Sequence, residues 1–579
     1  MTARDRRTTA RPGMPTNSTL LAELRETLGE RGVLAGPGPT RRFRTGYRVG
    51  AGSALAVVRP RSLVGLWRAL NLCIRHGAVV IPQAANTGLT GGSTPWGDDY
   101  CAPVVVLQMM GMPGIHVLDE GREVVCLPGA TLHALEKALR PYGREPHSVI
   151  GSSCIGASVV GGVCNNSGGS LLQRGPAYTE LAMFARVDGQ GHVALVNHLG
   201  IRLGADPETM LDALESRRFG AGDVAPAYGR LASDREYLQR VRAIDSEQPL
   251  RFNADPRRLY EASGSAGKVV VFAVRLDTFA KPRRSQVFYL GTNDPGEFTA
   301  LRRHVLGRFT HLPVSGEYLH RDAFDVAARY GKDTFLAVRS LGTSRLPTFF
   351  RLKSWCDDRG LPTDRLLQAV SLGFPNHLPP RLCAYRDRYE HHLIVHAADA
   401  GIEELADHLA TTFPSRSGDA LVCTADEGAR AQLHRFAAAG AAIRYLSLHR
   451  AALGGLVAVD VALRACELEW AEVLPPELRD CVETALYYGH FFCHVFHRDY
   501  LLRPGTDPGR FETALLALLD ARGAEYPAEH NVGHVYRAKP ALAAFYESLD
   551  PTHRLNPGIG CGHVGSSPSA GSADVTPAA

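Results

Sequence analysis

The sequence predicts an α+β protein built from at least two domains, and three observations lead to this prediction. The chain has 579 residues, which is too long for a single hydrophobic core. Strand-like and helix-like segments alternate in two regions, at about residues 54–139 and 390–465. Two stretches of small residues, at 81–95 and 147–175, are longer than an ordinary turn needs, which suggests that they wrap a ligand.

Each region can be divided into expected elements. Apolar runs predict strands at 54–58, 78–81, 104–108 and 124–127, and later at 286–290, 393–397 and 421–425. Helical spacing predicts helices within 18–48, where Asn17 or Ser18 could cap the start, and at 62–76, 131–139, 298–309, 321–330 and 427–439. No GxGxxG motif follows a strand, so a classical NAD-binding Rossmann unit is not predicted.

The composition is that of an ordinary folded protein. The net charge is +5 with a pI near 8.6, and nothing in the sequence suggests a nucleic-acid partner. No run of about twenty apolar residues predicts a transmembrane helix, and the basic N-terminus lacks the apolar core of a signal peptide. The twelve cysteines include no CxxC pair, so neither a disulfide framework nor an iron–sulfur motif is expected.

The first small-residue stretch, IPQAANTGLTGGSTP, follows a predicted strand and contains no bulky side chain that would shield its backbone. Such a loop lets successive N–H groups form a concave site for phosphate. The alternative interpretation is a glycine-rich surface turn. The second stretch, HSVIGSSCIGASVVGGVCNNSGGSLLQRG, favours the ligand interpretation, because two such stretches suit an extended ligand such as a dinucleotide cofactor.

Longer motifs point to a known family. The segments PQAANTGLTGGS, PGATLHALEKAL and IGSSCIGASVVGGVCNNSGG resemble the FAD-binding domain of the vanillyl-alcohol oxidase or p-cresol methylhydroxylase (PCMH) type. The segments REPHSVIGSSCIGAS, QRGPAYTE, GEYLHRD, HLPPR and YPAEHNVGH are similar to one branch, the quinone-dependent D-lactate dehydrogenases of bacterial membranes. The resemblance extends from about residue 55 to residue 560.

The resemblance implies a domain plan. Residues 50–280 would form a two-lobed PCMH-type FAD-binding domain, preceded by an N-terminal tail and helix at 1–49. Residues 281–338 and 381–560 would form an α+β cap that carries the substrate site, separated by a membrane-binding segment at 339–380. Residues 1–17 and 561–579 are rich in Arg, Thr and Pro or in Ser, Ala, Gly and Pro, and we expect both to be disordered tails.

The expected membrane-binding segment mixes arginines with aromatic residues. The basic residues are Arg339, Arg345, Arg351, Lys353, Arg359 and Arg365, and Phe349, Phe350, Leu352 and Trp355 lie among them. Cations attract anionic headgroups while aromatic side chains enter the acyl boundary. A solvated loop is the alternative, and the resemblance favours the membrane. It implies a peripheral protein on the anionic lipid surface of the cell inner membrane, on the cytoplasmic side, with a segment shorter than is usual in the family.

Two histidine-rich stretches suggest the chemistry. Gly489–His490 and His497 keep the GH-x6-H spacing of related flavin 2-hydroxy-acid dehydrogenases, and Glu529–His530 keeps their EH pair. The resemblance implies that His490, His497 and Glu529 bind a divalent metal and that His530 is the base. The chain departs from the pattern, with FFCHVF between the histidines and Asn531 in place of glycine. The histidines could therefore bind lactate by hydrogen bonds without a metal.

The remaining site residues are also expected from the resemblance. Arg381, Arg388 and His392 are candidates for binding the substrate carboxylate. The FAD-binding candidates are Ala84, Ala85, Asn86, Thr87, Gly88, Gly92 and Ser93 in the first stretch, then Gly151, Ser158, Gly168 and Val271. The first stretch contains no His or Cys to link to the flavin, so we expect non-covalent FAD.

The expected function is oxidation of D-lactate to pyruvate by hydride transfer to FAD, followed by electron transfer to a membrane quinone. The cofactor carries the redox chemistry and the protein positions it. Two alternatives stay open at this point. One is an FAD-dependent dehydrogenase of another D-2-hydroxy acid with a protein acceptor, and the other is a non-catalytic flavin-binding protein.

Overall fold

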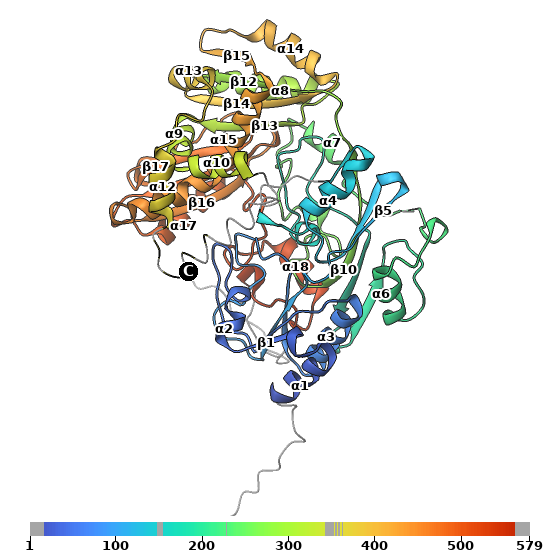
Figure 1. The fold of residues 1–579 in the computed structure, drawn as a ribbon. Helices are drawn as coiled ribbons and strands as arrows, with labels where there is room; N and C mark the ends of the chain where they lie inside the picture. Colours follow the sequence, from blue (N-terminus) through green and yellow to red (C-terminus); the bar gives the residue numbers. More distant parts are fainter. Residues whose placement is uncertain are drawn as a thin grey trace, which may run out of the picture.

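A computed structural model describes residues 17–147, 155–226, 229–341 and 363–561, together with residues 353, 356, 359 and 361. The chain forms an N-terminal lobe and a cap, which lie at the bottom and top of Figure 1. The N-terminal lobe contains a four-stranded and a five-stranded sheet, and the cap contains one seven-stranded sheet. Helices and sheets occur in both parts, which confirms the predicted α+β class.

The four-stranded sheet begins the N-terminal lobe. Its strands, in spatial order, are β1 (Val33–Ala35), β2 (Ala56–Val58), β4 (Val104–Gln108) and β3 (Val79–Gln83). Strands β2, β4 and β3 are parallel, and α3 (Leu63–Arg75) connects β2 to β3. The Ser62 hydroxyl caps α3 by accepting from the Gly65 N–H. Helix α1 (Asn17–Leu28) packs Leu20 and Leu24 into the same core.

The second sheet of this lobe is antiparallel throughout. Its strands, in spatial order, are β5 (Ile115–Leu118), β6 (Glu123–Cys126), β10 (Val270–Asp277), β8 (Ala182–Val187) and β9 (Val193–Asn197). The helices α4 (Leu132–Leu139), α5 (Val159–Cys164), α6 (Pro207–Glu215) and α7 (Tyr237–Val241) accompany it, and a short ribbon pairs β7 (Arg144–Glu145) with β11 (Phe279–Ala280). Its core contains Val271 and Leu135.

The cap is built on a seven-stranded antiparallel sheet. In spatial order the strands are β15 (Gly418–Val422), β12 (Ser285–Thr292), β14 (His391–Ala398), β13 (Ser315–His320), β17 (Val482–His490), β18 (Val495–Leu502) and β16 (Gly455–Ala462). The chain order and the spatial order differ, so β13 lies next to β17 although about 160 residues separate them. This pairing brings Glu317 opposite His490.

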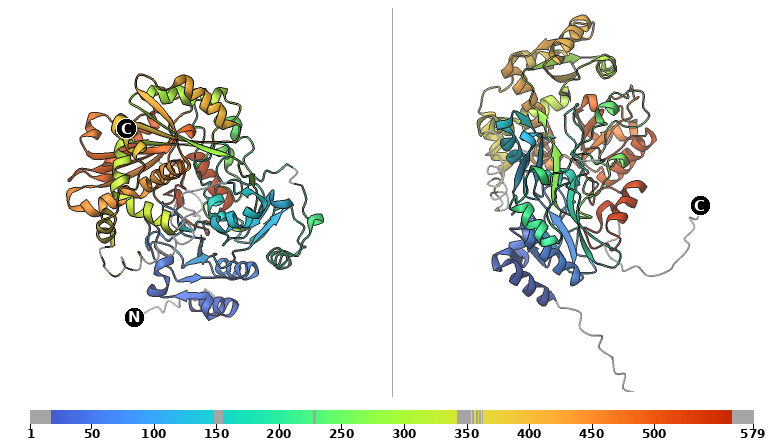
Figure 2. Two further views of the ribbon diagram at one scale, coloured as in Figure 1. Left: turned by 45° about the horizontal axis from the view of Figure 1, so that its top comes forward. Right: turned by 90° about the vertical axis from the view of Figure 1, so that its right-hand side faces the viewer.

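Helices cover both faces of this sheet, as Figure 2 (left) shows. One face carries α9 (Arg321–Tyr330), α10 (Lys332–Leu341), α12 (Thr363–Leu372), α13 (Pro380–Arg388) and the long α15 (Ala425–His449). The other face carries α8 (Pro295–Arg308), α14 (Gly401–Thr412) and α17 (Pro508–Ala521). Within the described residues, no helix combines the length and the apolarity needed to cross a bilayer.

The end of the described chain returns to the N-terminal lobe. Helix α18 (Pro540–Leu549) is followed by a bridge between Leu555 and Val80 of β3, and the Asn556 amide donates to the Gly92 carbonyl at 2.8 Å. The sequence-based plan placed all of residues 381–560 in the cap. The structure corrects this, because the last part of that range packs against the glycine-rich loop.

The helix prediction for residues 18–48 was too long, since α1 ends at Leu28 and is followed by the short strand β1. The helix predicted at 427–439 is longer in the structure, where α15 begins at Ala425 and ends at His449. A capping box between Thr424 and Glu427 stabilises its start. The hairpin β17–β18 was not predicted, because neither strand sequence shows a simple apolar–polar alternation, and nearly every residue of β18 is buried. Most residues expected to contact the membrane between 342 and 362 lie outside the described residues.

Candidate active site

The hairpin β17–β18 places His490 and His497 on one face of the cap sheet. His490 pairs with Val495 and His497 with Tyr488, so the two histidines are diagonal neighbours. Their ring centroids lie 5.4 Å apart. The residues between them, FFCHVF, form a tight turn whose phenylalanines are buried in the cap core. The departure from the family pattern therefore provides core packing for the turn and leaves the histidine spacing intact.

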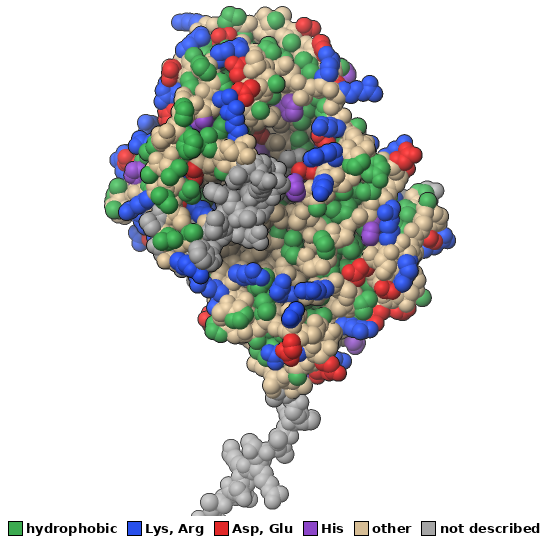
Figure 3. Space-filling model, viewed as in Figure 1, with side chains coloured by type: hydrophobic (Ala, Val, Ile, Leu, Met, Phe, Trp, Pro, Cys, Tyr) green, Lys and Arg blue, Asp and Glu red, His purple; other side chains and the backbone are tan. Residues whose placement is uncertain are grey.

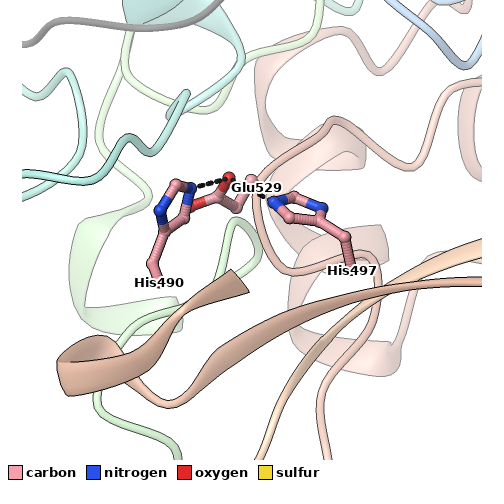
Figure 4. Close-up of side chains that lie close together, drawn as sticks. All are labelled: His490, His497 and Glu529. Carbon is pink, nitrogen blue, oxygen red and sulfur yellow. Dashed lines mark hydrogen bonds and ion pairs between the residues drawn. The ribbon is translucent and has the colours of Figure 1, made fainter. Parts of the chain in front are cut away.

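Glu529 lies between the two imidazoles, as Figure 4 shows. Its carboxylate is 3.1 Å from His490 Nε2 and 3.6 Å from His497 Nε2. One ligand atom from each of the three residues lies within 4.8 Å of the other two. The Glu529 backbone N–H donates to Asp460 on β16 at 2.6 Å, which fixes the start of the loop. The structure thus brings the three predicted metal-ligand candidates together.

Two arginines and a second carboxylate surround this group. Arg251 contacts Glu529 through Nη2, and Glu317 Oε1 lies 2.8 Å from His490 Nδ1. The other oxygen of Glu317 is 3.1 Å from Arg435 Nη2 on α15. All of these side chains are buried. Two carboxylates therefore face two permanent cations and one imidazole, so each carboxylate of this pocket has a cationic partner among the pocket's own side chains.

The two imidazoles have opposite acid–base properties. Burial would lower the pKa of His490, but Glu317 and Glu529 outweigh it and raise that pKa to about 10. Burial lowers the pKa of His497 well below its ordinary value, with Glu529 opposing only in part. Burial would raise the pKa of Glu529, yet His490 and Arg251 hold it well below the ordinary range. A protonated His490 can therefore donate to Glu317 and to Glu529 at the same time, whereas the neutral form of His497 is favoured.

The loop from Glu529 to His534 packs directly on the glycine-rich loop. The Thr90 hydroxyl donates to the Asn531 carbonyl at 2.8 Å, and the His534 N–H donates to the Thr90 carbonyl at 3.1 Å. The Asn531 side chain accepts from the Gly533 N–H at 2.7 Å and donates to the Tyr546 hydroxyl at 3.2 Å. Asn531, another departure from the family pattern, therefore stabilises the loop that carries His530.

We expect Gly533→Ala to separate these two loops. Gly533 has φ +53°, and a Cβ there would lie 2.2 Å from the Thr90 carbonyl oxygen. Gly505→Ala is the matched control, because Gly505 has φ +85° with no atom within 4 Å of the Cβ position. The left-handed backbone costs each alanine about 1–2 kcal/mol, so the control reports that cost alone. We expect Gly533→Ala to lower the thermal midpoint and the bound FAD clearly more than the control, and equal losses would contradict the close packing.

The glycine-rich loop itself is suited to bind an anion. Within the described residues, the backbone N–H groups of residues 85–92 make no hydrogen bond to other protein atoms. Asn86 and Gly91 adopt positive φ values of 55° and 70°. The predicted FAD-binding residues Ala84, Ala85, Asn86, Thr87, Gly88, Gly92 and Ser93 all belong to this loop. Free donors on a loop without bulky side chains fit the pyrophosphate of a dinucleotide.

The second small-residue stretch leads into the same site. Ser158 caps α5 by accepting from the Gly161 N–H at 3.1 Å. A Cβ at Gly168 would lie 3.1 Å from Glu529 Oε1 and 3.2 Å from Arg251 Cζ, so this glycine allows close approach to the site. Val271 lies on β10 at a register shift, with its side chain in the core. Gly151 falls outside the described residues.

Three predicted substrate-binding residues lie elsewhere. Arg381 is exposed on α13 and paired with Glu427 at 3.1 Å, beside β15. Arg388 is exposed near Asp419 on the same edge strand. Strand β15 is four strands from β17, about 19 Å at the usual spacing. His392 is fully buried between Tyr289 and Phe324. None of these three side chains therefore reaches Glu529.

The residues that sequence analysis missed are Arg251, Glu317 and Arg435. Arg251 belongs to the segment RFNADP, which also resembles the quinone-dependent D-lactate dehydrogenases, so a signal for it was present. Glu317 lies in GEYLHRD, another quoted segment, but nothing indicated that it would face His490. Arg435 is one of many arginines on predicted helices, and no sequence pattern distinguishes it.

Comparisons with known proteins agree with this geometry. A family model described as D-lactate dehydrogenase, membrane binding, matches residues 287–565, and an FAD binding domain model matches residues 54–196. The quinone-dependent D-lactate dehydrogenase of Escherichia coli (strain K12) is 52% identical over 552 residues, covering 94% of this chain and 96% of that protein. The chain belongs to the quinone-dependent D-lactate dehydrogenase family. The Haemophilus influenzae enzyme of the same name is also 52% identical, over 93% of this chain and 97% of that protein.

The chain shares its fold with more distant proteins of known structure. A structure of alkyldihydroxyacetonephosphate synthase has a TM-score of 0.55 at 11% identity, covering 93% of this chain and 84% of that one. A structure of p-cresol methylhydroxylase has a TM-score of 0.52 at 12% identity, covering 94% of this chain and 96% of that one. The predicted PCMH-type fold and FAD cofactor are confirmed. This quinone-dependent D-lactate dehydrogenase family member is an FAD-dependent oxidoreductase, and a non-catalytic role is not favoured.

Proposed function

We propose that this enzyme oxidises D-lactate to pyruvate with non-covalently bound FAD and passes the electrons to a membrane quinone. The observation that carries the proposal is the largely buried group His490, His497, Glu529 and Arg251, placed against the two small-residue stretches that suit FAD. The names of the full-length relatives supply the substrate and the acceptor.

The described residues can be given roles in this reaction. FAD, when bound, supplies the acceptor for the hydride that leaves lactate C2. His530 follows Glu529 directly and takes the hydroxyl proton, as the resemblance implies. Arg251 replaces Arg381 as the cation for the substrate carboxylate. Arg251 lies beside Glu529 and Gly168, and its buried Nε has no hydrogen-bond partner among the described residues, so a donor is left for a ligand.

The visible spectrum of the purified enzyme without oxygen tests this function. We expect D-lactate to bleach the flavin band within the mixing time of a manual assay, while L-lactate leaves it unchanged. Addition of a soluble quinone should then restore the band. Acid precipitation should release the flavin, because the glycine-rich loop offers no His or Cys for attachment. A flavin band that only longer 2-hydroxy acids bleach would contradict D-lactate as the substrate.

A divalent cation fits the histidine–carboxylate group by geometry but not by charge. The donor atoms are close enough, and Glu317 on His490 Nδ1 is the kind of outer partner that metal-binding histidines have. However, Arg251 already neutralises Glu529, and a further double charge would be repelled. We expect dialysis against EDTA to change the D-lactate bleaching rate by less than about twofold. A large loss that Zn²⁺ or Mn²⁺ reverses would show that a cation is required.

The enzyme is a peripheral membrane protein of its family, and the described part of the predicted membrane segment has a surface suited to this. Helix α12 and the residues flanking it expose a row of large apolar side chains: Leu361, Leu366, Val370, Leu372 and Phe374. On the face shown in Figure 3, hydrophobic and basic side chains lie together in the region where Figure 1 labels α12. We propose that this surface enters anionic lipid on the cytoplasmic side of the inner membrane.

Vesicle binding tests the lipid surface. We expect Leu366→Ser with Val370→Ser to weaken binding to phosphatidylglycerol vesicles by about tenfold, since two exposed apolar side chains lose their burial in lipid. The matched control is Val473→Ser, which alters an exposed apolar residue outside this segment. Bleaching by D-lactate in detergent should be unchanged in both proteins. Equal vesicle binding by the double variant and the control would contradict the proposed surface.

A further inference from the structure

A buried series of polar contacts connects helix α15 to the candidate active site. Glu317 on β13 lies opposite His490 on β17, and its Oε1 is 2.8 Å from His490 Nδ1. Its Oε2 is 3.1 Å from Arg435 Nη2. Glu317 is 9% exposed and Arg435 6% exposed, so water contributes little to holding either charge. A buried carboxylate that touches one imidazole and one guanidinium has little freedom to reorient.

Arg435 is fixed in its turn by Tyr488 and Asp499. The guanidinium carbon lies 4.6 Å from the centroid of the Tyr488 ring, and the Tyr488 hydroxyl donates to Asp499 Oδ2 at 3.0 Å. Tyr488 and His490 are two positions apart on β17, so their side chains point to the same face of the sheet, the face that α15 covers. The guanidinium is thus held between a carboxylate and an aromatic face, and both are anchored in the sheet.

Neither Glu317 nor Arg435 lies on the side of His490 that faces Glu529. Glu317 contacts His490 Nδ1 directly, and Arg435 acts on it through the Glu317 carboxylate. His490 Nε2 points to Glu529, 3.1 Å away. Since an imidazole turns about two side-chain bonds, a partner on Nδ1 determines where Nε2 points. We propose that Glu317 and Arg435 are positioning residues that fix the His490 ring for D-lactate oxidation. This inference rests on the proposed function.

Two charge-removing variants and a matched control test the inference. Glu317→Gln keeps the shape of its side chain, whereas Arg435→Gln shortens its side chain, and each variant removes the ion pair. Arg444→Gln is the control, because Arg444 lies on the same helix, is 9% exposed and pairs with the buried Asp333 at 2.7 Å. We expect the two site variants to reduce the anaerobic rate of flavin bleaching by D-lactate about 10–100-fold, as loss of an outer partner commonly does. The control should stay within about twofold of the wild-type rate.

Further measurements separate positioning from general damage. All three variants should lose similar thermal stability, and the KM for D-lactate should change less than kcat in the two site variants. Arg435→Lys keeps the charge but not the planar group, so its rate should fall between wild type and Arg435→Gln. If Arg435→Gln does not retain FAD, the comparison of Arg435→Lys with Arg444→Lys replaces it.

The outcomes distinguish this inference from the function on which it rests. Wild-type enzyme that D-lactate does not bleach would overturn the function itself. Wild-type bleaching combined with equal rates for Arg435→Gln and Arg444→Gln would overturn only the positioning role. A rise in KM with unchanged kcat would also overturn it, because it would place the pair in substrate binding.

Discussion

Replacing His530 with Asn is expected to slow flavin reduction by D-lactate about 10²–10⁴-fold while leaving KM within a few-fold of wild type. Removing a general base has an effect of this size because the hydroxyl proton then has no positioned acceptor. Arg251→Gln should show the opposite pattern, a large rise in KM with a smaller fall in kcat, since the buried guanidinium binds the carboxylate in ground state and transition state alike. Anaerobic stopped-flow spectra over a range of D-lactate concentrations measure both parameters.

His534→Asn is the control for damage to the loop. It lies four residues after His530, and its ring stacks on Trp96 with centroids 5.2 Å apart, away from Glu529. We expect this variant to lower FAD retention but to bleach within a few-fold of wild type once FAD is bound. If His530→Asn and His534→Asn lost the same rate, His530 would be a loop-supporting residue and another group would have to accept the proton.

Acid is expected to destabilise the cap between pH 6.5 and pH 3. His392 on β14 and His434 on α15 are buried between the cap sheet and this helix, and neither ring nitrogen of His392 has a hydrogen-bond partner among the described residues. Burial is the main cause that lowers the pKa of each to about 3. Below pH 6.5 each of these histidines binds a proton in the unfolded chain but stays neutral in the folded chain. The free energy of unfolding is therefore highest above pH 6.5 and falls as the pH approaches 3. At pH 5 each histidine costs about 2 kcal/mol.

Urea unfolding of the FAD-bound enzyme at pH 7 and pH 5 measures this loss. We expect His434→Leu to lose about 2 kcal/mol less than wild type between the two pH values, because one titrating group is gone. Its neighbours are Phe324 and His377, and the pKa of His377 is also lowered by burial, to about 4. His192→Asn, an exposed histidine, is the control and should keep the wild-type pH dependence. The same loss in both variants would mean that other groups cause the acid sensitivity.

Local elements were predictable where the signal was local. The strand at 104–108 and the helix at 321–330 match β4 and α9 in full, and Ser62 and Thr131 cap helices that begin next to them. Apolar periodicity and capping side chains act over a few residues, so they can be read directly from the chain. The hairpin β17–β18 was missed because its two strand sequences lack the apolar–polar alternation that identifies a strand.

The candidate site divides in the same way. Its histidines, Glu529 and the glycine-rich loop were found because each belongs to a short contiguous motif whose spacing limits its chemistry. The choice among arginines could not be made from the sequence, because Arg381 and Arg251 both lie in recognisable segments and neither segment shows what its side chain will meet. Arg381 meets Glu427 at the outer edge, and Arg251 meets Glu529 in the interior.

Composition and period along the chain indicated the α+β class, and short motifs that resemble a known family indicated the FAD loop and the pair of histidines. The charges that surround this pair could not be predicted, because they come from distant segments of the chain. Strand β13 joins β17 across about 160 residues, Arg251 arrives from the other lobe, and Arg435 arrives from α15. Such contacts depend on which strands pair and on how the two lobes pack against each other. Both depend on the burial of apolar surface over the whole molecule, which no short segment of the sequence reveals.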